Sequence, residues 1–157
     1  IAKGFGMKVS ALDPWVKDED MLADGITPVH SVEELYQNNQ YVSLHIPATP
    51  QTKKSVGKAL IELMPKNGVL INTARKEVID EESLAEALAA REDVRYVADV
   101  KPDIAAELEE KYPERVLFTP KKMGAQTAEA NINAGLAAAN QVAMHLKDGW
   151  NRFQVNK

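Results

Sequence analysis

The chain has 157 residues, 45% of them hydrophobic and 27% charged, which is typical of a globular protein with one core. Its net charge of −4 argues against a nucleic-acid partner, and no apolar run approaches the roughly 18 residues of a membrane span. The absence of cysteine excludes disulfides and thiolate metal sites, and it leads us to expect a cytoplasmic protein without a bound metal.

Short apolar runs that end in proline or polar residues predict the strands. In chain order they lie at 7–12, 41–46, 69–72, 96–100 and 116–118, with a last edge strand at 153–155. Residues 1–3 are interpreted as the end of a helix, and capping and amphipathic patterns predict further helices at 31–37, 58–64, about ten residues after Asp80, 104–111 and 125–147. This alternation indicates an α/β fold, a doubly wound parallel sheet with a terminal crossover helix and strand.

The strand at 69–72 is followed directly by Thr73, Ala74 and Arg75. Its run of apolar, partly β-branched residues is typical of a buried parallel strand. Ligands of open α/β sheets lie beyond the carboxyl ends of such strands, and the planar guanidinium suits a carboxylate, a phosphate or a carbonyl oxygen. The segment therefore predicts an anionic ligand at Arg75.

Other strand ends carry polar residues whose role remains open at this stage. Asp13 either binds ribose hydroxyls, as an acidic residue does in dinucleotide-binding sheets, or terminates its strand in an Asp-Pro turn. Asp99 can accept a hydrogen bond from a carboxamide or cap the turn that follows it. Taken alone, His45 before Pro47 reads as a histidine in a turn, and 49–52 as a polar loop.

A lysine pair, Lys121 and Lys122, precedes the predicted long helix. The helix dipole favours anions at this end, so two cations there are placed unfavourably. This placement indicates a bound anionic substrate, and a solvated basic turn is the equal alternative.

Five motifs occur in the order found in the D-2-hydroxyacid dehydrogenase family, which the chain resembles over nearly its whole length. The motifs are Asp13-Pro14, 41–47, 71–75, Asp99-Val100 and 119–127. Within the family, the runs 75–78 and 121–127 look most like lysine-type D-3-phosphoglycerate dehydrogenases.

The resemblance implies NAD as the cofactor and gives each motif a role. Asp13 would hold the adenosine ribose, and Asp99 would orient the nicotinamide carboxamide. Arg75 would bind the substrate carboxylate and polarise the keto oxygen, and Lys121 or Lys122 would carry the proton. The cofactor cleft would also be lined by His45, Pro47, Thr52, Thr73, Ala74, Gly124 and Ala125.

The chain departs from the family pattern in three places. Lys121 stands where the family has a histidine, and Ile104 stands where the glutamate that orients this histidine is expected. These two changes agree, because a lysine has no tautomer for a carboxylate to fix. The glycine-rich phosphate loop would precede Ile1, so we expect a sheet that is incomplete at its amino end and a carboxyl-terminal fragment that is inactive alone.

The resemblance also implies a domain division and a reaction. Residues 1–126 would form the NAD-binding domain without its glycine-rich loop, and 127–157 the crossover helix and last strand of the substrate domain. The reaction would interconvert a D-2-hydroxy acid and its keto acid, most closely 3-phosphoglycerate and 3-phosphohydroxypyruvate of serine biosynthesis, in a homodimer or larger assembly. The alternatives are a hydroxypyruvate or glyoxylate reductase and an NAD-binding module without catalysis.

Overall fold

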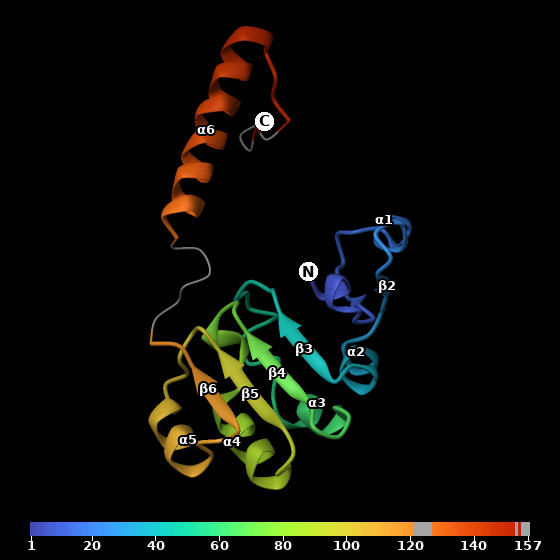
Figure 1. Ribbon diagram of the computed structural model, residues 1–157, viewed down its shortest axis with the longest axis vertical. Helices are drawn as coiled ribbons and strands as arrows, with labels where there is room; N and C mark the ends of the chain where they lie inside the picture. The colour runs from blue at the N-terminus through green and yellow to red at the C-terminus, as the bar shows by residue number, and fades with distance from the viewer. Residues whose placement is uncertain (121–126, 153, 155–157) are drawn as a thin grey trace. The chain divides into compact units, whose positions relative to one another are not determined.

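The computed structural model describes residues 1–120, 127–152 and 154. It divides the chain into two compact units, Ile1–Lys121 and Lys122–Lys157, and Figure 1 labels most of their helices and strands. Within the described residues, no helix is both long and apolar enough to cross a membrane.

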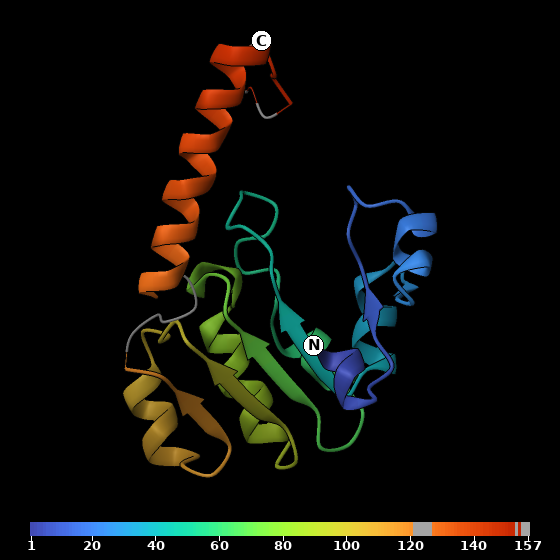
Figure 2. The ribbon, with the colours of Figure 1, turned by 45° about the horizontal axis from the view of Figure 1, so that its top comes forward.

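A four-stranded parallel sheet forms the centre of the first unit. Its strands are β3 (Tyr41–Leu44), β4 (Val69–Asn72), β5 (Arg95–Ala98) and β6 (Val116–Phe118). They pair in the order β3-β4-β5-β6, so every carboxyl end lies at the same edge of the sheet (Figure 2). The predicted parallel α/β fold is therefore confirmed, although β3 and β5 end two residues earlier than predicted and leave His45 and Asp99 in loops.

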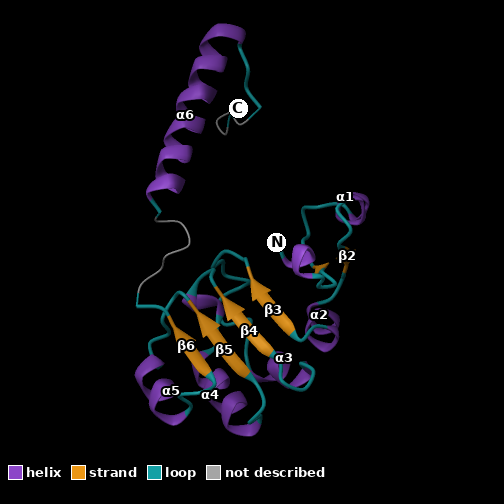
Figure 3. Ribbon diagram, in the orientation of Figure 1, coloured by secondary structure: helices purple, strands orange, loops and turns teal. Residues whose placement is uncertain are grey.

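Three helices connect these strands: α3 (Lys58–Leu63), α4 (Glu81–Ala90) and α5 (Ala105–Lys111) (Figure 3). Successive right-handed crossovers in one direction place such helices on the same face of a sheet. Each strand accordingly buries alternate residues. The strand register aligns these buried residues in two rows across the sheet, and the two rows form the sheet side of the core. These rows are Val42, Leu70, Tyr96 and Val116, and Leu44, Asn72, Ala98 and Phe118.

The segment before β3 differs most from the prediction. Its first strand, β1, is only Ser10–Ala11, and it pairs in a separate sheet with β2 (Thr27–Pro28), which the sequence pattern did not predict. The helix α1 (Asp18–Ala23) was also missed, because Met21 is its one buried residue and no apolar periodicity marks it. Three acidic residues in its first turn stabilise it instead, through the helix dipole. The predicted helix end at residues 1–3 is a short 3-10 turn, Ala2–Phe5.

Two further helices lie close to their predicted ranges, and the first of them begins at its predicted cap. The helix α2 (Val32–Asn38) begins where the backbone N–H of Glu34 donates to the Ser31 hydroxyl at 3.0 Å. The helix α6 (Ala128–Asp148) makes up most of the described part of the second unit. Its first turn is capped by the Thr127 hydroxyl, and it ends at Gly149, whose φ of 67° is the left-handed conformation of a helix C-terminus. The edge strand predicted at 153–155 lies outside the described residues, apart from Gln154.

An arginine-carboxylate pair fastens the loop between α3 and β4. The Nε and Nη2 atoms of Arg91 each donate to Asp93 at 2.8 Å, and the backbone N–H of Asn67 donates to the same carboxylate at 2.7 Å. The Arg91 guanidinium also donates to the carbonyls of Glu62 and Met64 at the end of α3. These bonds hold the pKa of the Asp93 carboxyl well below its usual range, chiefly through the hydrogen bond from Arg91.

This pair predicts a loss of stability on acidification. Asp93→Asn should lower the free energy of unfolding by about 1–2 kcal/mol at pH 7, since a hydrogen bond to a charged group contributes about that much when it is still partly hydrated. Because the folded-state pKa is depressed, the contribution is fully present above the unfolded-state pKa of about 3.9 and decreases progressively as the pH falls from there towards the lower folded-state pKa. Urea unfolding at pH 7 and pH 3 measures the difference, and an equal effect at both pH values would contradict the assignment.

Candidate active site

A pocket of about 340 Å³ opens at the carboxyl ends of β3 and β4. Its walls come from the two loops that directly follow these strands. The lining residues are His45, Ile46, Pro47, Thr73, Ala74 and Arg75. The structure therefore brings together five residues that the sequence assigned to one site, because parallel strands deliver their following loops to a common edge.

The loop after β4 is closed by its own side chains. The Oδ1 atom of Asn72 accepts a hydrogen bond from the Ala74 N–H at 3.0 Å, and its Nδ2 donates to the Arg75 carbonyl at the same distance. The Nη1 atom of Arg75 donates to the Ala74 carbonyl at 2.8 Å. This bond uses one of the five N–H groups of the guanidinium, and within the described residues the others remain available for a ligand.

The loop after β3 is held by hydroxyl groups. The Ser43 hydroxyl lies 3.0 Å from Nε2 of His45, which is one of the residues that line the pocket. Thr52 accepts the Thr49 N–H at 2.7 Å and donates to the Pro47 carbonyl. Thr52 is thus outside the pocket lining, and its hydroxyl shapes the loop that carries Pro47.

Asp99 follows β5 and is tied to the neighbouring loop through the backbone. Its N–H donates to the Asn72 carbonyl at 3.3 Å. One carboxylate oxygen, Oδ1, is buried and has no hydrogen-bond partner within the described residues. A buried acceptor left unpaired costs about 1–3 kcal/mol, so this oxygen fits a ligand that brings an N–H group. The carboxamide of nicotinamide is such a group.

Asp13 lies apart from this pocket, after β1 of the two-stranded sheet. Its Oδ1 accepts the Trp15 N–H at 2.8 Å and closes the Asp-Pro turn. The structure is therefore compatible with both interpretations of Asp13, as a turn residue and as a ribose-binding residue. An exposed carboxylate can close this turn with one oxygen and still offer its second oxygen to a hydroxyl.

The acidic residues near the position of the expected family glutamate serve the protein itself. The Glu81 carboxylate accepts the N–H groups of Asp103 and Ile104 and so caps the start of α5. Asp103 pairs with Lys76 at 2.6 Å, and this hydrogen bond is the main cause that raises the pKa of Lys76. Ile104 itself is packed against the core, so no carboxylate stands at the family's usual place.

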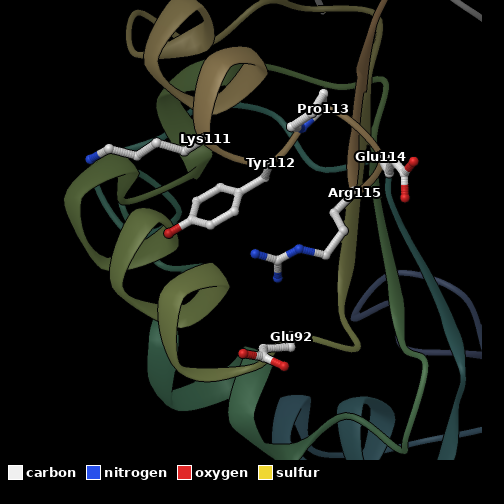
Figure 4. Close-up of a pocket in the computed structure, with 6 residues that line it drawn as sticks. All are labelled: Glu92, Lys111, Tyr112, Pro113, Glu114 and Arg115. Atoms are coloured by element: carbon white, nitrogen blue, oxygen red, sulfur yellow. The ribbon is translucent and has the colours of Figure 1, made fainter.

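A second, more open depression lies at the opposite edge of the sheet, before β6 (Figure 4). Its central cation, Arg115, stacks on Tyr112 with 4.2 Å between the guanidinium carbon and the ring centre. The same guanidinium donates to the carbonyls of Leu88 and Arg91 at the end of α4. These contacts give Arg115 a structural role, and we assign the depression no chemistry.

Four predicted site residues, Lys121, Lys122, Gly124 and Ala125, lie outside the described residues. Two residues that the sequence interpretation did not single out, Asn72 and Ser43, hold the pocket loops. Asn72 carried a signal, because it is a polar residue at an inward position of an apolar strand.

Comparison with known proteins agrees with this geometry. The sequence profile of the family described as "D-isomer specific 2-hydroxyacid dehydrogenase, NAD binding domain" matches residues 1–121. A D-3-phosphoglycerate dehydrogenase of Methanocaldococcus jannaschii is 35% identical over 152 residues, covering 93% of this chain and 28% of that protein. Its counterpart in Haemophilus influenzae is 32% identical, with 99% of this chain and 38% of that protein covered.

Solved structures give the same result. The NAD⁺-bound 3-phosphoglycerate dehydrogenase of Entamoeba histolytica has a TM-score of 0.82 and 42% identity, covering 99% of this chain and 49% of that one. The apo-structure of D-lactate dehydrogenase from Escherichia coli has a TM-score of 0.73 and 28% identity, covering 94% of this chain and 46% of that one. This chain thus spans less than half the length of each of these four proteins. It belongs to the D-isomer specific 2-hydroxyacid dehydrogenase family, whose cofactor is NAD, and its residues 1–121 match the NAD-binding domain of that family.

Proposed function

We propose that the intact gene product is an NAD-dependent dehydrogenase of D-2-hydroxy acids, with 3-phosphoglycerate as its substrate and 3-phosphohydroxypyruvate as its product, a reaction of serine biosynthesis. The observation that carries the proposal is the arrangement at the sheet edge. Arg75 offers guanidinium N–H groups, and the buried Oδ1 of Asp99 lacks a donor within the described residues. One group suits a substrate carboxylate and the other a carboxamide.

On the cofactor side, Asp99, Thr73, Ala74, His45 and Pro47 would hold the nicotinamide half of NAD. When bound, NAD supplies the acceptor for the hydrogen and electron pair that leave C2 of the hydroxy acid. Asp99 would accept the carboxamide N–H, which satisfies its unpaired oxygen. Thr52 would contribute by fixing the Pro47 carbonyl, and Gly124 and Ala125 by close approach to the ring.

At the other half of the cofactor, Asp13 would bind the adenosine ribose. A carboxylate accepts hydrogen bonds from both ribose hydroxyls and repels a 2′-phosphate, so it selects NAD over its phosphorylated form. The turn that Asp13 closes with the Trp15 N–H keeps the carboxylate in place before the cofactor arrives.

On the substrate side, Arg75 would bind the carboxylate and polarise the oxygen on C2. Either Lys121 or Lys122 would take the proton from that oxygen during oxidation and return it during reduction. The other lysine would bind the substrate phosphate as a point charge. This division of work needs no glutamate at position 104, in agreement with the isoleucine found there.

We further propose the domain division at residues 126 and 127, with α6 as the crossover helix to a substrate domain. The whole protein would form a homodimer or a larger assembly. We propose a cytoplasmic location, which a cysteine-free sequence fits because disulfides are rare in that reducing compartment.

The test compares matched substrates in the intact gene product. With NAD, 3-phosphoglycerate should exceed D-glycerate in kcat/KM by about 100-fold, since a lysine–phosphate hydrogen bond contributes about 2–3 kcal/mol. D-glycerate differs from it only by the phosphate, so the ratio isolates that group. NADH formation is followed by absorbance.

Two other outcomes would contradict the proposal. Rapid NADH-dependent reduction of glyoxylate or hydroxypyruvate, without a preference for the phosphorylated acid, would identify a reductase of the same family. NAD binding without turnover of any of these acids would identify a non-catalytic module.

A further inference from the structure

We propose that Asn72 is the positioning residue of this site, and that its side-chain amide sets the place of Arg75 while its backbone carbonyl sets the place of Asp99. The inference rests on the proposed function for the roles of Arg75 and Asp99. Asn72 is the one polar residue that is fully buried among the described residues, with 0% of its surface exposed. Burying an amide is unfavourable unless every polar group is paired, so its retention in the core requires an explanation.

The side chain of Asn72 closes the β4 loop from both ends. Its Oδ1 holds the Ala74 N–H and its Nδ2 holds the Arg75 carbonyl, both at 3.0 Å. The Ala74 carbonyl in turn accepts the Arg75 guanidinium at 2.8 Å. The positions of the Arg75 backbone and guanidinium therefore both depend on hydrogen bonds of one buried amide.

The backbone of Asn72 links this loop to the next one. Its carbonyl accepts the Asp99 N–H at 3.3 Å, beyond the last residue pair of the β4–β5 ladder. Tyr96, two residues before Ala98 on β5, places its hydroxyl 3.4 Å from Nδ2 and adds a weaker contact. Asn72 thus contacts both Arg75, proposed for the substrate carboxylate, and Asp99, proposed for the carboxamide, and it fixes the distance between them.

The chemistry of this position selects asparagine. The loop needs an acceptor for one N–H and a donor for one carbonyl, on a side chain short enough to reach both. A carboxylate provides the acceptor and lacks the donor, alanine provides neither, and a protonated carboxyl provides both. This difference allows the role to be tested by pH.

The first test uses Asn72→Ala in the intact gene product. It should reduce kcat/KM for 3-phosphoglycerate by about 100-fold, the loss that a displacement of about 1 Å of a substrate-binding group can cause. The Kd for NADH, measured by fluorescence, should change less than about threefold, because Asp13 and the backbone carbonyl that accepts the Asp99 N–H are both unchanged. Amide hydrogen exchange of Ala74, which requires no turnover, should accelerate at least about tenfold as its bond is lost.

Val94→Ala is the matched control. Val94 is 1% exposed and precedes β5 at the opposite end of the strand, so this substitution weakens the core without touching the loop. It should leave the KM for 3-phosphoglycerate and the exchange of the Ala74 amide unchanged. If it reproduces the Asn72→Ala effects, Asn72 acts through stability alone and the proposal fails.

The second variant, Asn72→Asp, decides the matter even if Asn72→Ala does not fold. Burial favours the neutral form of the introduced carboxyl, which restores both the donor and the acceptor. The kcat/KM of this variant, relative to wild type, should rise by up to about tenfold per unit of decreasing pH while the carboxyl becomes protonated. A ratio that stays constant and far below 1 between pH 8 and pH 6 would overturn the proposal, whereas a ratio near 1 at both pH values means that the carboxyl is already protonated and supports it. If the wild type turns over no hydroxy acid, the proposed function fails instead, and the exchange of the Ala74 amide still tests the loop.

Discussion

Arg75→Ala should reduce kcat/KM for the 2-hydroxy acid by about 10²–10⁴-fold. A guanidinium forms two parallel hydrogen bonds to a carboxylate, each worth about 1.5–3 kcal/mol, and alanine removes both. Steady-state rates of NADH formation by the intact gene product provide the measurement. Because Arg75 also polarises the oxygen on C2 in this proposal, kcat should fall as well as KM rise.

Arg75→Lys serves as the conservative variant for this experiment, and Arg95→Ala serves as its control. Lysine keeps the charge and loses the planar fork, so an intermediate loss of about 10–100-fold is expected. Arg95 is an exposed arginine at the amino end of β5, the edge of the sheet opposite to the pocket. Its replacement should leave kcat/KM unchanged. A loss smaller than about tenfold for Arg75→Ala would remove Arg75 from the substrate site.

Lys121→Met and Lys122→Met should separate the proton carrier from the phosphate-binding lysine. A positioned general acid or base contributes about 10²–10⁴-fold, so one of the two variants should lose that much in kcat. The other should mainly raise the KM for 3-phosphoglycerate and leave the KM for D-glycerate almost unchanged. Methionine is close in length to the apolar part of the lysine side chain and lacks the ammonium group.

The pH profile provides a second readout for the same pair. A lysine that accepts a proton must be neutral, so the rate of hydroxy-acid oxidation by the wild type should rise with pH, and this rise should disappear in the variant of the carrier. Lys66→Met serves as the control, because Lys66 lies in an exposed turn before β4. If both Lys121→Met and Lys122→Met change only substrate binding, the proton passes through another group.

The sheet could be predicted because its strands are marked by continuous apolar runs. In β3 and β4 the runs end at polar residues, and the structure places the pocket at those ends. The segment between β1 and β3 could not be predicted in the same way, since α1 buries one side chain and β2 contains Pro28. Elements this short depend on neighbours that are distant in sequence, and local patterns carry little information about them.

The candidate site shows the same division. The sequence pattern singled out Arg75 because ligands of open sheets lie beyond the carboxyl ends of strands, whereas Asp99 received its role only from the family resemblance. The pattern carried no indication that the hydroxyl of Thr52 is directed to the Pro47 carbonyl, or that an oxygen of Asp99 is buried without a donor in the described structure. Both facts depend on how separate loops pack together.

The sequence by itself therefore determined the α/β class, the family and the set of polar residues at the strand ends, because strand runs, turns and motif order are local properties of the chain. Only the tertiary structure decided which of these residues share a pocket, and that Asn72 connects them. The physical reason is that the hydrogen bond from the Asp99 N–H to the Asn72 carbonyl forms only when β4 and β5 lie in register, whereas the bonds of Asn72 with Ala74 and Arg75 are local to one loop.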